Sequence, residues 1–221
     1  MDPQKICFIT CVNNDEVYQE CLLYIHNLDI PQGYSVETVA VREAASMTSA
    51  LNQAMQKSDA KYKVYLHQDV FIINKNFIKD ILQLFEDPSI GLIGVVGSSQ
   101  IPPNGVWWEA EKIFGQVYDS HRGFIEKLAF RQLENEYQEV DCVDGLIMIT
   151  QVDIPWRDDL FTSWHFYDLS QSREFGRNHY KVVVARQSEP WCIHDCGLTR
   201  VCSDYNKYRE VFIHEYLQDD R

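Results

Sequence analysis

The sequence lacks long apolar runs and any excess of basic residues. No stretch approaches the roughly 20 apolar residues of a membrane helix, and the apolar run near the start, KICFITCV, is too short for a signal peptide. We therefore expect a cytoplasmic protein without a membrane span. Lys and Arg number 20 against 33 Asp and Glu, which gives a formal net charge of -13. This balance argues against a nucleic-acid partner, because binding to phosphate backbones depends on basic surfaces.

The sequence also lacks a cysteine framework, repeats and linkers. The seven cysteines are odd in number and irregularly spaced, so reduced thiols are the simplest account. Cys192, His194, Cys196 and Cys202 leave a structural zinc site as an alternative, although their spacing matches no standard zinc motif. No internal repeat, low-complexity tract or linker divides the chain, which predicts a single domain over residues 1–221.

What is present is an alternation of short apolar strands and amphipathic helices. Strands are predicted at residues 6–12, 36–41, 63–73, 92–96, 143–150 and 181–185. Helices are predicted after Asn13, which forms a capping-box pattern with Glu16, and then near Ser46, after Asn74 or Asn76, and from about Asp204. The polar stretch 109–139 is expected to be partly helical. This order predicts βαβ units and a largely parallel sheet in an α/β fold.

A carboxylate stands in the middle of one predicted strand. In VYLHQDV, polar His67, Gln68 and Asp69 interrupt an apolar run, and a buried ionised carboxylate is costly unless it is paired or bound to a metal. Ligands of open α/β sheets bind beyond the carboxyl ends of the strands, which would place His67 and Asp69 beside a ligand. The alternative is an aspartate that caps the helix after Ile73, but Asp69 lies several residues too early for that role.

Five segments in a fixed order carry a family resemblance. NNDEVYQECL, SALNQAMQKSDAKYKVYLHQDVFI, VDGLIMIT, DDLFTSWHFYDLS and PWCIHDCG resemble the family-2-type inverting glycosyltransferases, especially a small streptomycin-biosynthesis glycosyltransferase-like family. The resemblance spans nearly the whole chain. It implies the GT-A fold, a Rossmann-like three-layer α/β/α architecture with a mixed, mainly parallel central sheet. It also implies a nucleotide-sugar donor and a divalent metal, Mn²⁺ or Mg²⁺.

The resemblance assigns donor and metal residues. HQD stands where relatives carry Asp-x-Asp, so Asp69 is the expected metal ligand, and His67 replaces the first aspartate. His194 occupies the place of a late histidine that helps to hold the metal or diphosphate, although a lone histidine is often structural. The nucleotide-sugar is expected to contact Thr10, Cys11, Val12, Asn13, Asn52, His67, Gln68 and Gly145. For Gly145 the alternative is tight strand packing.

The catalytic base and the acceptor side are expected in the aromatic second half. By resemblance Asp168 is the general base, and the competing role is a carboxylate stabilised at a helix N-terminus. The acceptor side is assigned to Trp107, Trp108, Trp164 and His165, because flat rings stack on sugars. The same tryptophans could instead anchor loops or the core.

The expected function is transfer of a sugar from a nucleotide-sugar to an acceptor hydroxyl, with metal assistance and inversion. The first alternative is a non-catalytic nucleotide-sugar-binding or scaffold protein with a degenerate GT-A site. The second is a nucleotidyltransferase, but CVNNDEV has neither a Gly-rich phosphate loop nor an early basic residue. The acceptor is unknown. Because the chain is short for this class of enzyme, a homodimer or another partner could complete the site.

Overall fold

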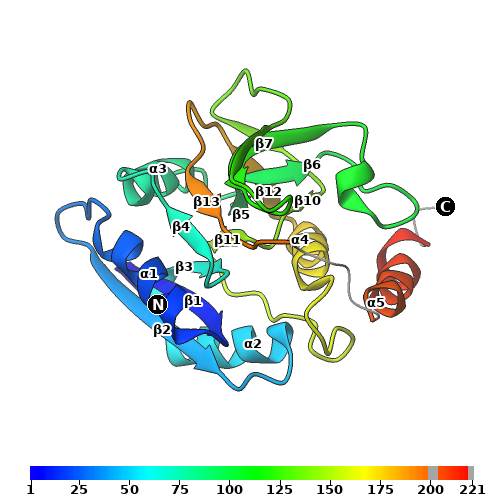
Figure 1. Cartoon of the computed structure of the whole chain (residues 1–221), viewed down its shortest axis with the longest axis horizontal. Coiled ribbons are helices and arrows are strands. Elements are labelled where there is room, and N and C mark those ends of the chain that lie inside the picture. The colour runs from blue at the N-terminus through cyan, green and yellow to red at the C-terminus, as the bar shows by residue number, and fades with distance from the viewer. Residues whose placement is uncertain (199–203, 219–221) are drawn as a thin grey trace.

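The computed structural model describes residues 1–198 and 204–218, and Figure 1 shows them as two twisted sheets flanked by helices. The larger sheet has seven strands in the order β2-β1-β3-β11-β5-β12-β9. Its strands are β1 (Asp2–Val12), β2 (Ser35–Arg42), β3 (Ala60–Leu66), β5 (Ile90–Gly94), β9 (Tyr137–Glu139), β11 (Ile147–Thr150) and β12 (Lys181–Ala185). β2, β1, β3, β5 and β12 run in one direction, whereas β11 and β9 run against them. The mixed, mainly parallel sheet is therefore confirmed.

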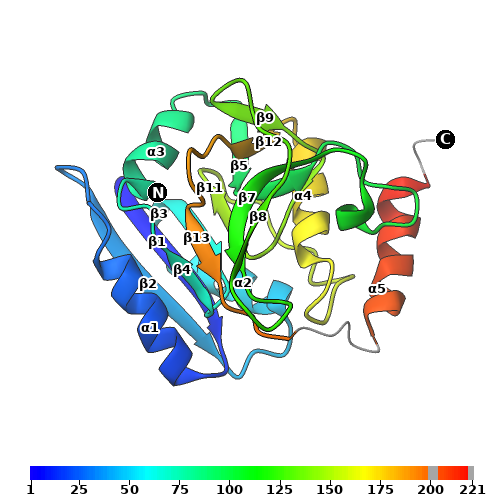
Figure 2. The same cartoon turned by 45° about the horizontal axis from the view of Figure 1, so that its top comes forward.

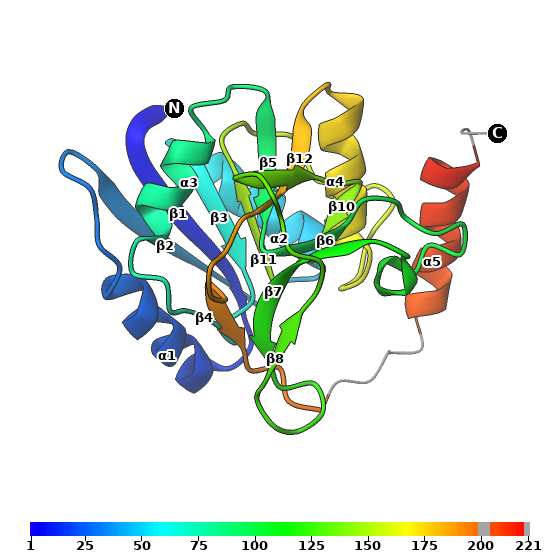
Figure 3. The ribbon, with the colours of Figure 1, turned by 90° about the horizontal axis from the view of Figure 1, so that it is seen from above.

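Helices cover both faces of this sheet, as the buried side chains of β1 require. Ile6 and Phe8 pack into one core with α1 and α3, whereas Cys7 and Ile9 pack into a second core with α2 and α4. The helices are α1 (Asp15–His26), α2 (Met47–Lys57), α3 (Phe77–Leu84) and α4 (Tyr167–Arg177). Successive side chains of a strand point to opposite faces, so β1 is buried on both sides. Figure 3 shows the resulting three layers from above, which confirms the predicted α/β/α arrangement.

A smaller, six-stranded sheet draws its strands from both halves of the chain. Its order is β10-β6-β7-β13-β4, with β8 paired to β7. Its strands are β4 (Val70–Ile72), β6 (Val96–Ser98), β7 (Ile113–Asp119), β8 (Glu126–Ala129), β10 (Cys142–Val143) and β13 (Cys192–His194). The predicted strands 63–73, 92–96 and 143–150 are each wrong as single strands, because their two ends lie in different sheets. At 67–69 the polar triplet forms the turn where the chain crosses between the sheets.

The expectation of helix in residues 109–139 is also wrong. Only the short 3₁₀ helix η1 (Trp107–Glu109) touches this stretch, and the rest of its regular structure is β7, β8 and β9. On β7 the buried positions are Gly115, Val117 and Asp119. Only one of these three is apolar, so the alternation of apolar and polar residues that marks a strand is hidden.

The helices α1 and α2 begin within one residue of the capping residues predicted from the sequence. Asn14, not Asn13, caps α1, and its side chain accepts hydrogen bonds from the backbone N–H groups of Glu16 and Val17. Ser46 caps α2, as predicted. The last helix, α5 (Tyr205–Phe212), continues as a π-helical turn (Ile213–Leu217) and lies at the opposite edge of the molecule from β2 (Figure 2). Among the described residues, no helix has the length and apolar character to cross a bilayer.

Candidate functional site

Strand pairing places one histidine between two aspartates. β13 lies between β7 and β4, and its last residue is His194. In register, His194 stands beside Asp119 of β7 and beside Val70 of β4, the residue that follows Asp69. Oδ2 of Asp119 is 2.9 Å from Nδ1 of His194, and Oδ1 of Asp69 is 3.7 Å from Nε2 of the same ring. Asp119 thus holds Nδ1 of the imidazole, and Nε2 on the opposite side of the ring faces the carboxylate of Asp69.

A second imidazole joins this group from the turn after β3. Nδ1 of His67 lies 3.4 Å from Nε2 of His194, and Nε2 of His67 lies 2.6 Å from the hydroxyl of Tyr167. The Tyr167 hydroxyl donates to the carbonyl oxygen of Gly145 at 3.0 Å, so it accepts from Nε2–H of His67. Nδ1 of His67 therefore carries the lone pair and directs it at His194.

The donor atoms of this cluster fit a divalent transition-metal ion. His67, Asp69 and His194 each offer one ligand atom, and these atoms lie within 4.8 Å of one another. Two imidazoles and one carboxylate suit Mn²⁺ better than Mg²⁺, which prefers oxygen ligands. The carboxylate of Asp119 on Nδ1 of His194 orients the ring so that Nε2 can act as a ligand, which is a common arrangement around bound metals.

The structure shows which residues of the alternative zinc site lie close together. His194 and Cys196 group with Asp119, and their ligand atoms also lie within 4.8 Å of one another. Cys192 is buried in the core, and Cys202 lies outside the described residues. Of the four residues of the zinc alternative, His194 and Cys196 thus lie together in the described structure, beside the carboxylate of Asp119.

Charges alternate through the cluster. Burial alone would lower the pKa of His194, but the hydrogen bond to Asp119 and the charge of Asp69 outweigh it and raise that pKa to about 10. Burial and the neighbouring His194 together lower the pKa of His67 to about 4. Burial opposes ionisation of Asp119, yet hydrogen bonds from His194 and His121 hold its pKa at about 2. At neutral pH a cation would compete with the proton on His194.

The first turn of α4 carries Asp168 to the same region. Phe166 precedes the helix with a φ of 61°, a backbone conformation that is strained for a bulky side chain and costs about 1–3 kcal/mol. Backbone N–H of Gly145 donates to Oδ2 of Asp168 at 3.2 Å. A Cβ at position 145 would lie 2.2 Å from the hydroxyl oxygen of Tyr167, so only glycine fits beneath this turn.

Two neighbouring carboxylates disfavour each other's ionisation at this point. Burial, and secondarily the charge of Asp144, raise the pKa of Asp168 to about 7. Burial also raises the pKa of Asp144. Asp168 can therefore exchange a proton near neutral pH, as a general base must.

A cleft of about 370 Å³ opens beside Asp168. Its polar lining consists of His67, Asp144, His165 and Asp168. Its aromatic lining comes from η1, the segment before α4, α4 itself and α5, namely Trp107, Trp108, Trp164, Phe166, Tyr167 and Tyr205. The four residues expected on the acceptor side thus share one cleft with Asp168. Asp69 does not line it and connects to it through His194 and His67.

The residues expected around the donor fall into two groups. Oε1 of Gln68 accepts from the backbone N–H groups of Asn13 and Asn14 at 3.0 Å, which ties the end of β1 to the turn at 67–69. Of residues 10–13, Thr10 and Val12 are buried, Cys11 is half-buried and Asn13 is exposed. Asn52 lies elsewhere on α2, where its amide exchanges two 2.9 Å hydrogen bonds with the backbone of Trp156. These two hydrogen bonds fix the Asn52 amide against the segment that contains Trp156.

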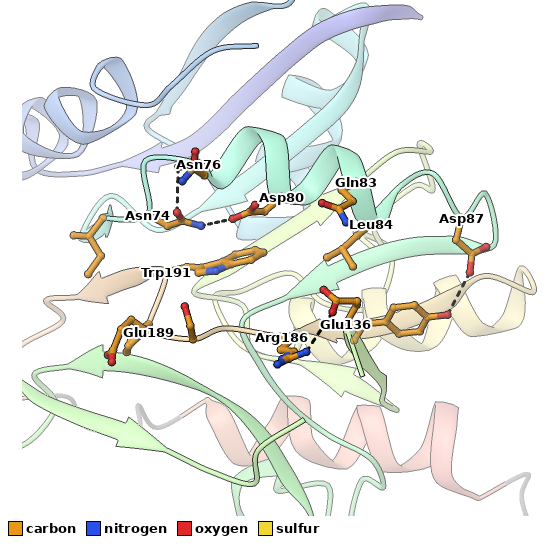
Figure 4. A pocket seen from close by; sticks show the side chains of 14 residues that line it. Asn74, Asn76, Asp80, Gln83, Leu84, Asp87, Glu136, Arg186, Glu189 and Trp191 are labelled. Atoms are coloured by element: carbon orange, nitrogen blue, oxygen red, sulfur yellow. Dashed lines mark hydrogen bonds and ion pairs between the residues drawn. The ribbon is translucent and has the colours of Figure 1, made fainter. Parts of the chain in front are cut away.

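A larger cavity of about 540 Å³ lies between α3, β9 and the segment before β13. Figure 4 shows that several of its polar side chains are engaged with one another. Asn74 donates to Asp80 at 2.7 Å, and Arg186 pairs with Glu136 at 3.3 Å. Neither the His67 cluster nor Asp168 lines this cavity.

The profile of a family described as "Glycosyltransferase like family" matches residues 7–216. The chain belongs to this family. A curated relative, the streptomycin biosynthesis protein StrF of Streptomyces griseus, is 32% identical to this glycosyltransferase-like chain over 143 residues. The match covers 62% of the chain and 47% of StrF, so the chain spans about half the length of that relative.

Solved structures show the same GT-A fold at low sequence identity. S. aureus TarS has a TM-score of 0.61 and 10% identity, over 95% of this glycosyltransferase-like chain and 39% of TarS. The mannosyltransferase PcManGT of Pyrobaculum calidifontis, solved with GDP-Man and Mn²⁺, has a TM-score of 0.55 and 11% identity, over 87% of this chain and 57% of PcManGT. The predicted fold class is thereby confirmed.

Sequence reasoning missed three residues of the site in this glycosyltransferase-like chain: Asp119, Asp144 and Tyr167. Asp144 directly follows the apolar Cys142 and Val143, which is a signal like the one that singled out Asp69. Tyr167 was hidden among the many aromatic residues of SWHFYDLS. Asp119 becomes recognisable only when the pairing of β7 with β13 is known.

Proposed function

We propose that this chain is a metal-assisted, inverting glycosyltransferase that moves a sugar from a nucleotide-sugar to an acceptor hydroxyl. The observation that carries the proposal is a continuous polar path. It runs from Asp69 and His194 through His67 to Tyr167, and the backbone of Gly145 then links the Tyr167 hydroxyl to Asp168 on the wall of the cleft. Such a path connects a metal-ligand group to a carboxylate that can accept a proton near neutral pH. We assign this activity to residues 1–221 as one domain.

The donor is assigned to the side of His67 that faces away from the acceptor. The ligands of a divalent ion would be Asp69, His194 and His67, and the end of β1 at residues 10–13, with Gln68, would contact the nucleotide. A bound divalent ion neutralises the negative charge that develops on a leaving diphosphate. Support comes from two relatives: PcManGT was solved with GDP-Man and Mn²⁺, and TarS with UDP-GlcNAc.

Asp168 performs the proton transfer. Its ionised carboxylate accepts the proton of the acceptor hydroxyl while the acceptor oxygen forms a bond to the anomeric carbon. The bond from that carbon to the diphosphate oxygen breaks, and the nucleoside diphosphate leaves with its electron pair. Attack from the face opposite the leaving group inverts the anomeric configuration. Gly145 N–H holds Oδ2 of Asp168 during this step, which leaves Oδ1 for the acceptor.

A calorimetric titration with UDP and GDP, with and without Mn²⁺, tests the donor half of the proposal. We expect saturable binding that requires Mn²⁺ and that Asp69→Asn weakens at least about tenfold, because a hydrogen-bonded or metal-bound charge is removed. Asp29→Asn is a matched control, since Asp29 is an exposed loop residue outside the cluster. Equal affinity of Asp69→Asn and wild type would remove Asp69 from the metal site.

Release of the nucleoside diphosphate from a bound nucleotide-sugar tests the catalytic half of the proposal. An enzyme hydrolyses or transfers the sugar in the presence of Mn²⁺, whereas a binding protein with a degenerate site retains the intact donor. Mn²⁺-dependent binding without any turnover across UDP- and GDP-sugars would favour the non-catalytic alternative.

A further inference from the structure

The cleft beside Asp168 presents aromatic faces that are fixed before a ligand arrives. Trp108 and Trp164 line it and are 47% and 46% exposed, although large aromatic side chains are usually well buried. Trp108 packs against Tyr205 with ring centroids 5.8 Å apart, and His165 packs edge-on against the same tyrosine at 5.3 Å. Because Trp108, Tyr205 and His165 hold one another, a ligand that stacks on Trp108 does not have to order that ring first.

The charged groups of the cleft are of one sign. Asp144 and Asp168 line it, and none of the described lining residues is Lys or Arg. Oδ1 of Asp144 accepts from the backbone N–H of Leu146 at 2.9 Å, and Oδ2 of Asp168 accepts from Gly145. An ionised carboxylate can accept about four hydrogen bonds. Both side chains therefore retain capacity for a donor group on a ligand.

The imidazole of His165 does not offset this negative charge. Burial lowers the pKa of His165, so its ring is neutral at neutral pH. His194 lies outside the lining and pairs with Asp119. An anionic acceptor would meet two carboxylates and no Lys or Arg in the described lining, which disfavours its binding.

We propose that the acceptor is an amine-bearing sugar, whose ammonium group binds the carboxylate of Asp144 while its ring stacks on the exposed tryptophans. Ammonium groups are recognised by carboxylates and by the faces of tryptophan and tyrosine, and this cleft combines both. Its volume of about 370 Å³ lies near the lower end of ligand pockets, about 300–1,000 Å³, which allows one or two sugar rings. The inference rests on the proposed glycosyltransferase function and names its acceptor class.

This assignment separates the roles of the two carboxylates. Asp144 is the counter-ion of the ammonium group, and Asp168 remains the proton acceptor for the hydroxyl. Their mutual repulsion disfavours two negative charges in the empty cleft, and a bound cation relieves it. Binding of an amine therefore favours the ionised form of Asp168 that the reaction needs.

Calorimetric titration without nucleotide tests the inference. The probes are glucosamine, its β-1,4-linked dimer, the N-acetylated forms of both, and glucose 6-phosphate. We expect the free amines to bind at least about tenfold more tightly than their acetylated counterparts, because acetylation removes a hydrogen bond between charged groups. Glucose 6-phosphate should give no saturable heat.

Three variants separate the charge effect from a general loss of structure. Asp144→Asn should bring amine and acetylated sugars to within about twofold of each other, since only the charged contact is lost. Trp164→Ala should weaken both kinds of sugar by a similar factor. Asp158→Asn, an exposed carboxylate outside the cleft, should preserve the preference. Near-UV circular dichroism of each variant verifies that the aromatic packing persists.

Four results would overturn the inference: equal affinity for amine and acetylated sugars, preferential binding of glucose 6-phosphate, an amine preference that survives Asp144→Asn, or no saturable binding of any amine. A parallel titration of the same samples with UDP or GDP and Mn²⁺ distinguishes the two proposals. Nucleotide binding without an amine preference rejects only the acceptor class, whereas absent nucleotide binding rejects the glycosyltransferase itself.

Discussion

Nδ1 of His194 lies 2.9 Å from Oδ2 of Asp119, so the opposite nitrogen of the ring faces His67 and Asp69. The pairing of β13 with β7 produces this contact, because the two residues share one register position. Asp119 is thus a positioning residue: it does not enter the cluster of His67, Asp69 and His194 but decides which nitrogen His194 presents to it.

Replacing Asp119 with asparagine should weaken metal binding without abolishing the fold. The amide keeps the shape but loses the charge that favours the correct ring orientation. We expect Mn²⁺ affinity to fall by about 10–100-fold, the usual effect of removing such an outer carboxylate. Electron paramagnetic resonance of free Mn²⁺ measures it directly, with Asp29→Asn as control. An unchanged affinity would mean that Asp119 serves only to pair the strands.

Asp168→Asn should abolish turnover but leave the donor bound. We expect the rate of sugar transfer to fall by about 10²–10⁴-fold, the usual contribution of a general base. Calorimetry with nucleotide and Mn²⁺ should give wild-type affinity. In wild type, kcat/KM should fall as the pH drops below about 7, because the pKa of Asp168 is raised to that value and the protonated acid accepts no proton. A flat profile between pH 5 and 8 would contradict this role.

The raised pKa of Asp168 should also make the stability of the protein depend on pH. A pKa of about 7 in the folded state exceeds the value of about 3.9 in the unfolded chain, so the folded state holds more protons between these two values. The free energy of unfolding of wild type, relative to that of Asp168→Asn, should therefore fall as pH rises from about 4 to about 7. Urea unfolding at several pH values measures the difference. A difference that stays constant over this window would be inconsistent with a buried, protonated Asp168.

Two glycines offer a matched pair of substitutions. A Cβ on Gly145 would lie 2.2 Å from the hydroxyl oxygen of Tyr167, so Gly145→Ala should destabilise the protein by about 1–3 kcal/mol through overpacking. A Cβ added to Gly176, on α4, would have no neighbouring atom within 4 Å. Gly176→Ala should therefore stabilise the protein by about 0.5–1 kcal/mol, since alanine is the better helix former. Thermal unfolding of both variants checks the contrast, and equal effects would contradict it.

The layers of the fold were predictable because their signals are local. Apolar runs such as residues 181–185 and helix caps such as Ser46 lie within a few residues of the structure they specify. The family resemblance supplied the GT-A class. What the sequence did not reveal is where a strand changes sheets. Val95, for example, separates β5 from β6, but the nearby Gly94 and Gly97 lie within the two strands and so do not mark the break itself.

The candidate site was predictable where one residue conflicted with its surroundings. Asp69 in an apolar run carried such a signal, whereas Asp168 was assigned through the family resemblance. Asp119 carried no such signal, because its neighbour His194 is 75 residues away and only parallel pairing brings the two together. For Asn52, which the resemblance places near the nucleotide-sugar, the structure adds two hydrogen bonds to the backbone of Trp156 that no local sequence signal indicated.

The turn at residues 67–69 has a consequence for cooperativity. It leads from β3 in one sheet to β4 in the other, and the cluster beside it draws His194 from the second sheet. A cation held there would link the two sheets at the turn between β3 and β4. Locally unfolded species in which the sheets have separated at this turn cannot bind the cation. Each tenfold increase of free cation above its dissociation constant therefore adds about 1.4 kcal/mol to the free energy of this local opening. A bound metal should thus slow hydrogen exchange of β3 and β4 beside the turn more than that of the distant edge strand β2.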